Sequence, residues 1–171
     1  MIIRHLTPGD SIPALTDLLH AAYAGLGKMG FNYTAVDQTE DVTLKRIARG
    51  DCLVAVEAGI LVGTIMFHAP SRSNGCPWYD RPGTATIGQF GVHPDQQGRG
   101  VGTLLLREAE SLAISHGADE LALDTSEGAH HLIGWYERAG FRSVDHAQWK
   151  GKTYRSVIMS RSVMSGSAPV S

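Results

Sequence analysis

Apolar and polar positions alternate in short runs along most of the chain, as they do in strands that bury one face. Strands are predicted over seven segments: 2–6, 52–56, 60–67, 84–92, 121–123, 141–149 and 154–160. A turn at Ala58-Gly59 separates the second segment from the third, and Lys150-Gly151-Lys152 separates the last two. Each of these two pairs is therefore expected to form a hairpin.

Apolar residues at helical spacing separate the predicted strands. Four helices are expected, over about 12–23, 39–48, 100–116 and 129–139, and Gly117 and Gly140 are placed to end the last two. Residues 25–39 and 69–83 have no clear period and are expected to be surface loops. The order β-α-α-β-β-β-α-β-α-β-β predicts an α/β fold, with one mixed sheet flanked by helices.

Bulk properties narrow the class of protein. The 171 residues predict a single domain over 1–161, followed by a small, polar and mobile tail over 162–171. Fifteen Lys and Arg against seventeen Asp and Glu give no general attraction to nucleic acid or to an anionic membrane. The start of the chain does not resemble a signal peptide, and no apolar run is long enough to cross a membrane. A cytoplasmic protein is expected.

No metal site is expected from the sequence. Cys52 and Cys76 form neither a CxxC pair nor a cluster, and are interpreted as ordinary reduced thiols. His130 and His131 are adjacent, so on a helix they point to different faces and do not form a metal-binding pair.

A glycine-rich turn after the strand over 84–92 is the most informative segment. Pro94 ends the strand, and Gly98, Gly100 and Gly102 open the next helix. Glycine lets backbone N–H groups approach an anion closely, and a helix N-terminus adds free donors with a partial positive charge. The predicted ligand is a phosphate group. The spacing fits neither a P-loop nor the dinucleotide fingerprint, and a tight turn without a ligand stays an alternative.

Two motifs, which follow each other along the chain, resemble motifs of the GNAT superfamily of N-acetyltransferases in the same order. The first is Gln/Arg-x-x-Gly-x-Gly/Ala, matched by Gln97, Gly100 and Gly102 and preceded by the apolar-x-Val-x-Pro pattern of 90–94. The second is a helix that ends in Tyr-x-x-x-Gly-Phe, matched by Tyr136-Glu137-Arg138-Ala139-Gly140-Phe141. The resemblance covers about 3–161 and is sharp over 87–141.

This resemblance implies a fold and a cofactor. The fold would be a mixed sheet of about seven strands with about four helices, in which the strands that carry Phe90 and Leu123 splay apart to bind acetyl-CoA. Backbone groups of Phe90 and Val92 would bind the pantetheine arm. The pyrophosphate would lie on the turn. Its expected cofactor-binding residues are Gln97, Gly98, Arg99, Gly100, Val101, Gly102 and Thr103.

The resemblance also implies catalytic roles. The Phe90 N–H would stabilise the oxyanion, and Tyr136 would be the general acid that protonates the leaving thiolate. The alternative for Tyr136 is a structural residue with a bonded hydroxyl. No base is evident, and His68, His93, Asp124 or a water chain stay open. Many relatives have a cofactor-contacting Asn where this chain has Ala129, and Ser126, Glu127 and His130 stay open as its replacement.

The acceptor is the least defined part of the prediction. The two loops over 25–39 and 69–83 and the last hairpin are expected to line its site. Their candidate residues are Phe31, Tyr33, Asp37, Trp78, Tyr79 and Asp80. Both a small-molecule amine and a peptide N-terminus would suit them. An acyl-CoA sensor or scaffold without turnover is the alternative function, and a homodimer stays open.

Overall fold

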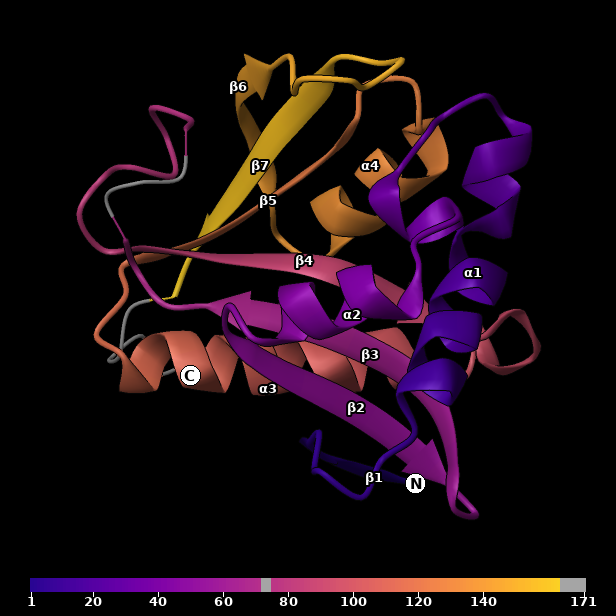
Figure 1. Ribbon diagram of the computed structural model, residues 1–171. Helices are drawn as coiled ribbons and strands as arrows, with labels where there is room; N and C mark the ends of the chain where they lie inside the picture. The colour runs from indigo at the N-terminus through magenta and orange to yellow at the C-terminus, as the bar shows by residue number, and fades with distance from the viewer. Residues whose placement is uncertain (72–74, 164–171) are drawn as a thin grey trace.

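The computed structural model describes residues 1–71 and 75–163, which fold around one seven-stranded sheet (Figure 1). The strands are β1 (Ile2–His5), β2 (Asp51–Glu57), β3 (Ile60–His68), β4 (Thr84–Val92), β5 (Glu120–Ser126), β6 (Arg142–Ala147) and β7 (Ser156–Ser162). The α-helices are α1 (Ile12–Lys28), α2 (Glu40–Ile47), α3 (Val101–Ser115) and α4 (His130–Arg138). Two short 3₁₀ turns are η1 (Thr34–Val36) and η2 (Pro94–Gln96).

The sheet has the order β1-β2-β3-β4-β5-β7-β6, and β4 and β5 are its parallel pair. They pair only from Thr84 to Thr86, opposite Glu120 to Ala122. Beyond Thr86 the two strands diverge, as Figure 1 shows. The predicted mixed sheet and its central splay are therefore confirmed.

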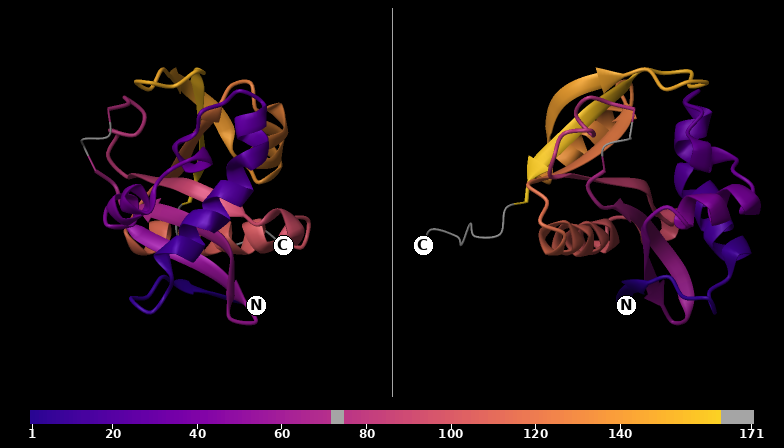
Figure 2. Two further views of the ribbon diagram at one scale, coloured as in Figure 1. Left: turned by 45° about the vertical axis from the view of Figure 1, so that its right-hand side comes forward. Right: turned by 60° about the vertical axis from the view of Figure 1, so that its left-hand side comes forward.

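Helices cover both faces of the sheet because successive residues of each central strand point to opposite sides. In β2, Leu53 and Ala55 pack with Leu105 of α3, whereas Val54 packs with Leu15 of α1. Helices α1 and α2 therefore lie on one face and α3 on the other (Figures 1 and 2).

Helix α1 is longer than the sequence pattern predicted. Ser11 caps it by accepting a hydrogen bond from the Ala14 N–H at 3.1 Å, and the helix continues through Lys28 rather than ending near Tyr23. Tertiary packing explains the extra turn, since Leu26 is buried. A Cβ on Gly27 would lie 2.9 Å from a methyl group of Val36, so glycine there allows η1 to pack closely. The predicted loop over 25–39 is therefore partly helical.

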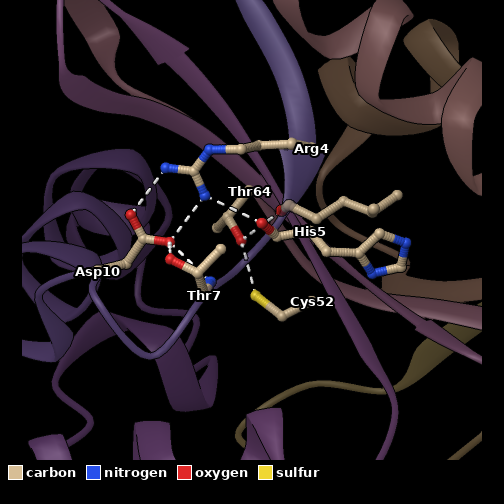
Figure 3. Close-up of polar contacts among 7 residues, drawn as sticks. Arg4, His5, Thr7, Asp10, Cys52 and Thr64 are labelled. Atoms are coloured by element: carbon tan, nitrogen blue, oxygen red, sulfur yellow. Dashed lines mark hydrogen bonds and ion pairs between the residues drawn. The ribbon is translucent and has the colours of Figure 1, made fainter.

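The junction between β1 and α1 is fixed by an ion pair. The Arg4 guanidinium donates to both carboxylate oxygens of Asp10, at 2.7 and 2.8 Å (Figure 3). Asp10 also accepts from the N–H and hydroxyl of Thr7. The Arg4 guanidinium, followed by the Thr7 N–H, holds the pKa of Asp10 well below its ordinary value.

The end of the chain also differs in its boundaries. The last hairpin has a longer connection than Lys150-Gly151-Lys152, because β6 already ends at Ala147. Strand β7 continues to Ser162, and Val163 is buried with its N–H bonded to the Asp119 carbonyl. The rest of the expected tail, 164–171, and part of the expected loop, 72–74, lie outside the described residues.

Candidate active site

Strand β4 bulges where the sheet opens. Two of its residues, Gln89 and Phe90, lie opposite the single Ile65 of β3. Gln89 has φ of +44°, a left-handed conformation that is uncommon outside glycine. Such a bulge redirects the strand and re-aims its groups, which fits a functional position.

The backbone groups of Phe90 and Val92 lie on the open side of β4. The His93 N–H donates to the Val62 carbonyl of β3 at 2.9 Å, so strand alternation directs Val92 and Phe90 away from β3. No described strand pairs with β4 on that side beyond Thr86. Tyr23 of α1 donates its hydroxyl to the Phe90 carbonyl at 2.9 Å, which fixes the bulge to the helix.

The glycine-rich turn presents a row of free backbone donors. Gly98 and Gly100 have φ of +76° and +83°, and Gly100 is the N-cap of α3. The N–H groups of residues 98–103 have no acceptor in the described part of the chain, and the Leu104 N–H is the first to bond back, to Gly100. A Cβ on Gly98 or Gly100 would meet no described atom within 4 Å. The turn therefore fits a phosphate group.

Side chains around this turn support its shape. Gln97 donates from Nε2 to the Val92 carbonyl at 3.2 Å. Arg99 points away to Glu57 of β2, at 3.2 Å, and also bonds Gln96. The structure therefore uses the Arg99 guanidinium in a surface ion pair.

The first turn of α3 offers its backbone rather than its side chains. Val101 is buried in the core, whereas Thr103 is exposed. A Cβ on Gly102 would lie 3.5 Å from Trp135 and 3.6 Å from Phe90, so this glycine faces the aromatic side chains at the splay.

Tyr136 of α4 is 9% exposed and lies beside the bulge. Its ring packs against Phe90, Trp135 and Phe141, with centroids 6.4, 5.3 and 5.8 Å away. Its hydroxyl has no hydrogen-bond partner among the described residues, and the side chain lines a cavity. Burial, and then the nearby Tyr23, raises the pKa of Tyr136 well above its ordinary value, so the phenol keeps its proton at neutral pH.

The cavity occupies about 140 Å³ at the splay, between β4, β5, the α1–α2 segment and the last hairpin. Its lining residues are Tyr23, Tyr33, Thr34, Ala35, Arg46, Ile87, Gly88, Gln89, Phe90, Leu123, Asp124, Tyr136, Trp149, Lys152 and Tyr154. Residues 97–103 do not line it. The phosphate-sized cradle and the cavity are therefore separate, and β4 connects them, since Phe90 lines the cavity and the turn follows the end of this strand.

Asp124 is the carboxylate that lines the cavity, and both of its oxygens are held. Oδ1 accepts from the Tyr79 hydroxyl at 2.7 Å, and Oδ2 accepts from Trp149 Nε1 at 3.0 Å. Of the three candidate bases, only Asp124 reaches the cavity. His68 lies at the end of β3 and contacts the Arg49 carbonyl, and His93 caps η2.

Aromatic side chains form the opposite wall. The Tyr33 hydroxyl bonds Thr125 Oγ1 at 2.7 Å and accepts from the Ser126 N–H at 2.8 Å. Its ring stacks on Tyr154, with the centroids 4.9 Å apart. Phe31 packs behind both rings. Of the predicted acceptor-site residues, Tyr33 lines the cavity.

The other acceptor-site candidates lie outside this cavity, and several of its lining residues were not among the predicted ones. Phe31, Asp37, Trp78, Tyr79 and Asp80 do not line the cavity, although Tyr79 acts through Asp124. The missed residues include Arg46 and Lys152. Arg46 lies three residues from the buried Thr43 and so shares its helix face, but this burial is not readable from the sequence.

The start of α4 carries no Asn at the position where many relatives have one. Ala129 is buried at the N-cap and provides no side-chain cap. Of the nearby polar residues, Ser126 accepts from the Gly128 N–H, and Glu127 pairs with Arg155 at 2.8 Å. Both side chains are therefore engaged within the protein.

No group of three His, Cys, Asp or Glu that could hold a metal occurs within 1–71 and 75–163. Cys52 and Cys76 are buried free thiols. None of the described helices is both long and apolar enough to span a membrane.

Known proteins share this sequence pattern and fold. The model of the acetyltransferase (GNAT) family matches residues 13–141. S-(2-succino)cysteine N-acetyltransferase of Bacillus subtilis (strain 168) is 31% identical over 140 residues, which are 80% of this chain and 82% of the relative.

Solved structures have the same fold. The ribosomal-protein-S18-alanine N-acetyltransferase of Escherichia coli superposes with a TM-score of 0.71 at 16% identity, over 99% of this chain and 98% of its own. A GNAT family acetyltransferase of Elizabethkingia anophelis with acetyl-CoA bound superposes with a TM-score of 0.66 at 18% identity, over 94% of this chain and 97% of its own. The chain therefore belongs to the GNAT acetyltransferase family, and it is an N-acetyltransferase.

Proposed function

We propose that residues 1–161 form one catalytic domain, which transfers the acetyl group of acetyl-CoA to the primary amine of a small molecule in the cavity beside Tyr136. One observation carries the proposal: β4 leads from the cavity that Gly88–Phe90 line at the splay to the turn at 98–103, whose N–H groups have no described acceptor. When bound, acetyl-CoA supplies a thioester that an amine can attack directly, with its thiol as the leaving group.

The binding residues follow from the free donors. The backbone N–H groups of Gly98, Arg99, Gly100, Val101, Gly102 and Thr103 hold the pyrophosphate. Gln97 maintains the turn through its bond to the Val92 carbonyl. The open edge of β4 at Phe90 and Val92 binds the pantetheine arm in the manner of an added strand.

Separate residues stabilise the developing charge, accept a proton from the amine and donate a proton to the leaving sulfur. The Phe90 N–H donates to the carbonyl oxygen of the acetyl group as charge develops there. Asp124, held by Tyr79 and Trp149, orients the amine and takes the proton that leaves to solvent. Tyr136 gives its proton to the sulfur and is restored by the second proton of the acceptor nitrogen. One N–C bond forms, one C–S bond breaks, and one proton is released.

Two observations support a small acceptor over a peptide N-terminus. The cavity of about 140 Å³ is smaller than the ~300–1,000 Å³ typical of sites for drug-sized ligands. The B. subtilis relative is named for a cysteine derivative. A sensor without turnover is not favoured, because a buried phenol whose hydroxyl has no described partner fits proton donation better than structural support.

Thiol release from acetyl-CoA, measured across a panel of small amines and peptides, tests the proposal. The expected result is release with at least one small amine, together with a product heavier by one acetyl group. Calorimetry with CoA is run on the same sample. Binding of CoA without turnover on any amine would overturn the catalytic assignment.

A further inference from the structure

Two cations line the cavity without a carboxylate partner. Arg46 donates from Nη1 to the amide oxygen of Gln38 at 2.8 Å. Lys152 donates from Nζ to the Asn32 carbonyl and the Thr34 hydroxyl, at 2.9 Å each. Neither cation forms an ion pair with any residue in the described ranges. The direct hydrogen-bond partners of each cation are thus neutral groups.

Arg46 is close enough to Lys152 to affect its titration. Burial lowers the pKa of Arg46, and burial followed by the charge of Arg46 lowers the pKa of Lys152. Other charges act on them as well: Arg49 lowers the pKa of Arg46, whereas Asp124 opposes the lowering at both cations and Asp37 opposes it at Lys152. Like charges that converge on a partly dry cavity favour an anion between them.

Arg46 is positioned by a buried chain of amides. Gln38 Nε2 donates to the Thr43 hydroxyl at 2.8 Å and to Gln89 Oε1 at 3.2 Å. Gln38 and Gln89 are each 4% exposed, and Gln89 lies in the β4 bulge. Gln89 Nε2 is itself buried with no acceptor among the described residues. This network holds one N–H of the guanidinium and leaves the others free for a ligand.

We infer that the acceptor is an amine that also carries a carboxylate, in the simplest case an amino acid, and that Arg46 and Lys152 bind this carboxylate. The inference rests on the proposed function, since it describes the acceptor of the same cavity. Arg46, Lys152 and Asp124 leave one net positive formal charge among the lining residues, which a monoanionic carboxylate neutralises. The ammonium end of the acceptor then lies at Asp124, so the cavity complements a zwitterion.

Binding of a carboxylate without an amine tests the anion site apart from turnover. Calorimetry on CoA-saturated protein compares succinate with its neutral analogue succinamide. Succinate is expected to bind about 10- to 100-fold more tightly, the range for charge-assisted hydrogen bonds. Arg46→Met and Lys152→Met should each remove most of this preference. Equal affinities for the two probes, or unchanged succinate binding in both variants, would overturn the inference.

Matched controls come from adjacent residues. Lys45→Met and Lys150→Met remove exposed cations next to Arg46 and Lys152 that do not line the cavity, and both should bind succinate like the wild type. Arg46→Met also deprives the buried Gln38 oxygen of its donor, so circular dichroism checks its fold. Lys152→Met, on the surface hairpin, keeps the test valid if the Arg46 variant fails to fold.

The rate of acetylation provides a second test of the inference. L-Amino acids are compared with their α-amides, whose amines are less basic and more often neutral. Faster acetylation of the acids, by about tenfold or more in kcat/KM, is expected despite that disadvantage, and Arg46→Met should abolish the difference. Acetylation of acids and amides at equal rates would refute the inference and leave the proposed function intact. Succinate binding through Arg46 and Lys152 without acetylation of any amine would refute the proposed function instead.

Discussion

Replacing Tyr136 with Phe removes one hydroxyl and keeps the ring that packs against Phe90, Trp135 and Phe141. The hydroxyl has no partner among the described residues, so its loss leaves no buried donor or acceptor unpaired. A typical hydrogen bond contributes ~1 kcal/mol to stability, and the change here should be smaller than that. For a chain of this size the melting temperature should then move by less than ~4 °C.

The effect on turnover should be much larger. General acid catalysis contributes ~10²–10⁴-fold, which corresponds to ~3–5 kcal/mol of transition-state stabilisation. The pKa of Tyr136 is raised well above its ordinary value by burial, so the wild type should show no loss of kcat from deprotonation of Tyr136 below pH ~10. Stopped-flow or steady-state thiol release gives kcat, and calorimetry should show an acetyl-CoA affinity close to that of the wild type.

Tyr33→Phe is the matched control, because it removes a hydroxyl that bonds Thr125 and Ser126. Its order of effects should be reversed, with a loss of ~1–2 kcal/mol in unfolding free energy and less than a tenfold change in kcat. Near-normal turnover in Tyr136→Phe, on an acceptor that the wild type acetylates, would remove Tyr136 from the mechanism.

Three further changes probe other parts of the account. Gly100→Glu puts an anion into the phosphate cradle and should weaken CoA binding at least about tenfold by calorimetry, whereas Gly100→Ala has the same left-handed strain without the charge and should bind more tightly than the Glu variant. Asp10→Asn removes the Arg4 ion pair. Because the pKa of Asp10 is lowered in the folded state, the stability that this carboxylate adds should be full above pH ~3.9 and decline as the pH falls below it. Urea unfolding should therefore separate the wild type and the variant at pH 7 and bring them closer at pH 3. Leu105→Ala empties a fully buried core position and should cost ~2–5 kcal/mol in the same assay, and a loss below 1 kcal/mol would contradict the packing of α3 on the sheet.

The parts of the fold that could be predicted depend on local pattern. Strand β4 begins and ends at the predicted residues, and α3 lies within one residue of its expected ends, because alternation, helical spacing and Gly100 and Gly117 are local signals. The extension of α1 to Lys28 could not be predicted in the same way, since the close packing of Gly27 on Val36 is tertiary. The left-handed Gln89 gave no signal either, because such φ values are associated with glycine.

At the site, too, features that depend on local sequence could be predicted, whereas those set by tertiary packing could not. The turn at Gly98 and Gly100 could be predicted because glycine chemistry is readable from the sequence, although its ligand contacts stay predictions. Arg46 and Lys152 could not be paired from the sequence, since they are more than a hundred residues apart and meet only when α2 and the last hairpin pack around the splay. Asp124 was one of three equal candidates for the base, and the structure places it in the cavity lining, where Tyr79 and Trp149 donate to its carboxylate.

Hydrogen–deuterium exchange with and without CoA tests the central claim most directly, that the cofactor lies at the splay with its pyrophosphate on residues 98–103. In the free protein the backbone N–H groups of these residues have no described acceptor, so they should exchange rapidly. Saturating CoA should slow exchange in peptides that cover 88–104, while peptides from β1 and β2 should change little. Unchanged exchange across 98–103 under saturating CoA, or protection confined to another region, would contradict the account.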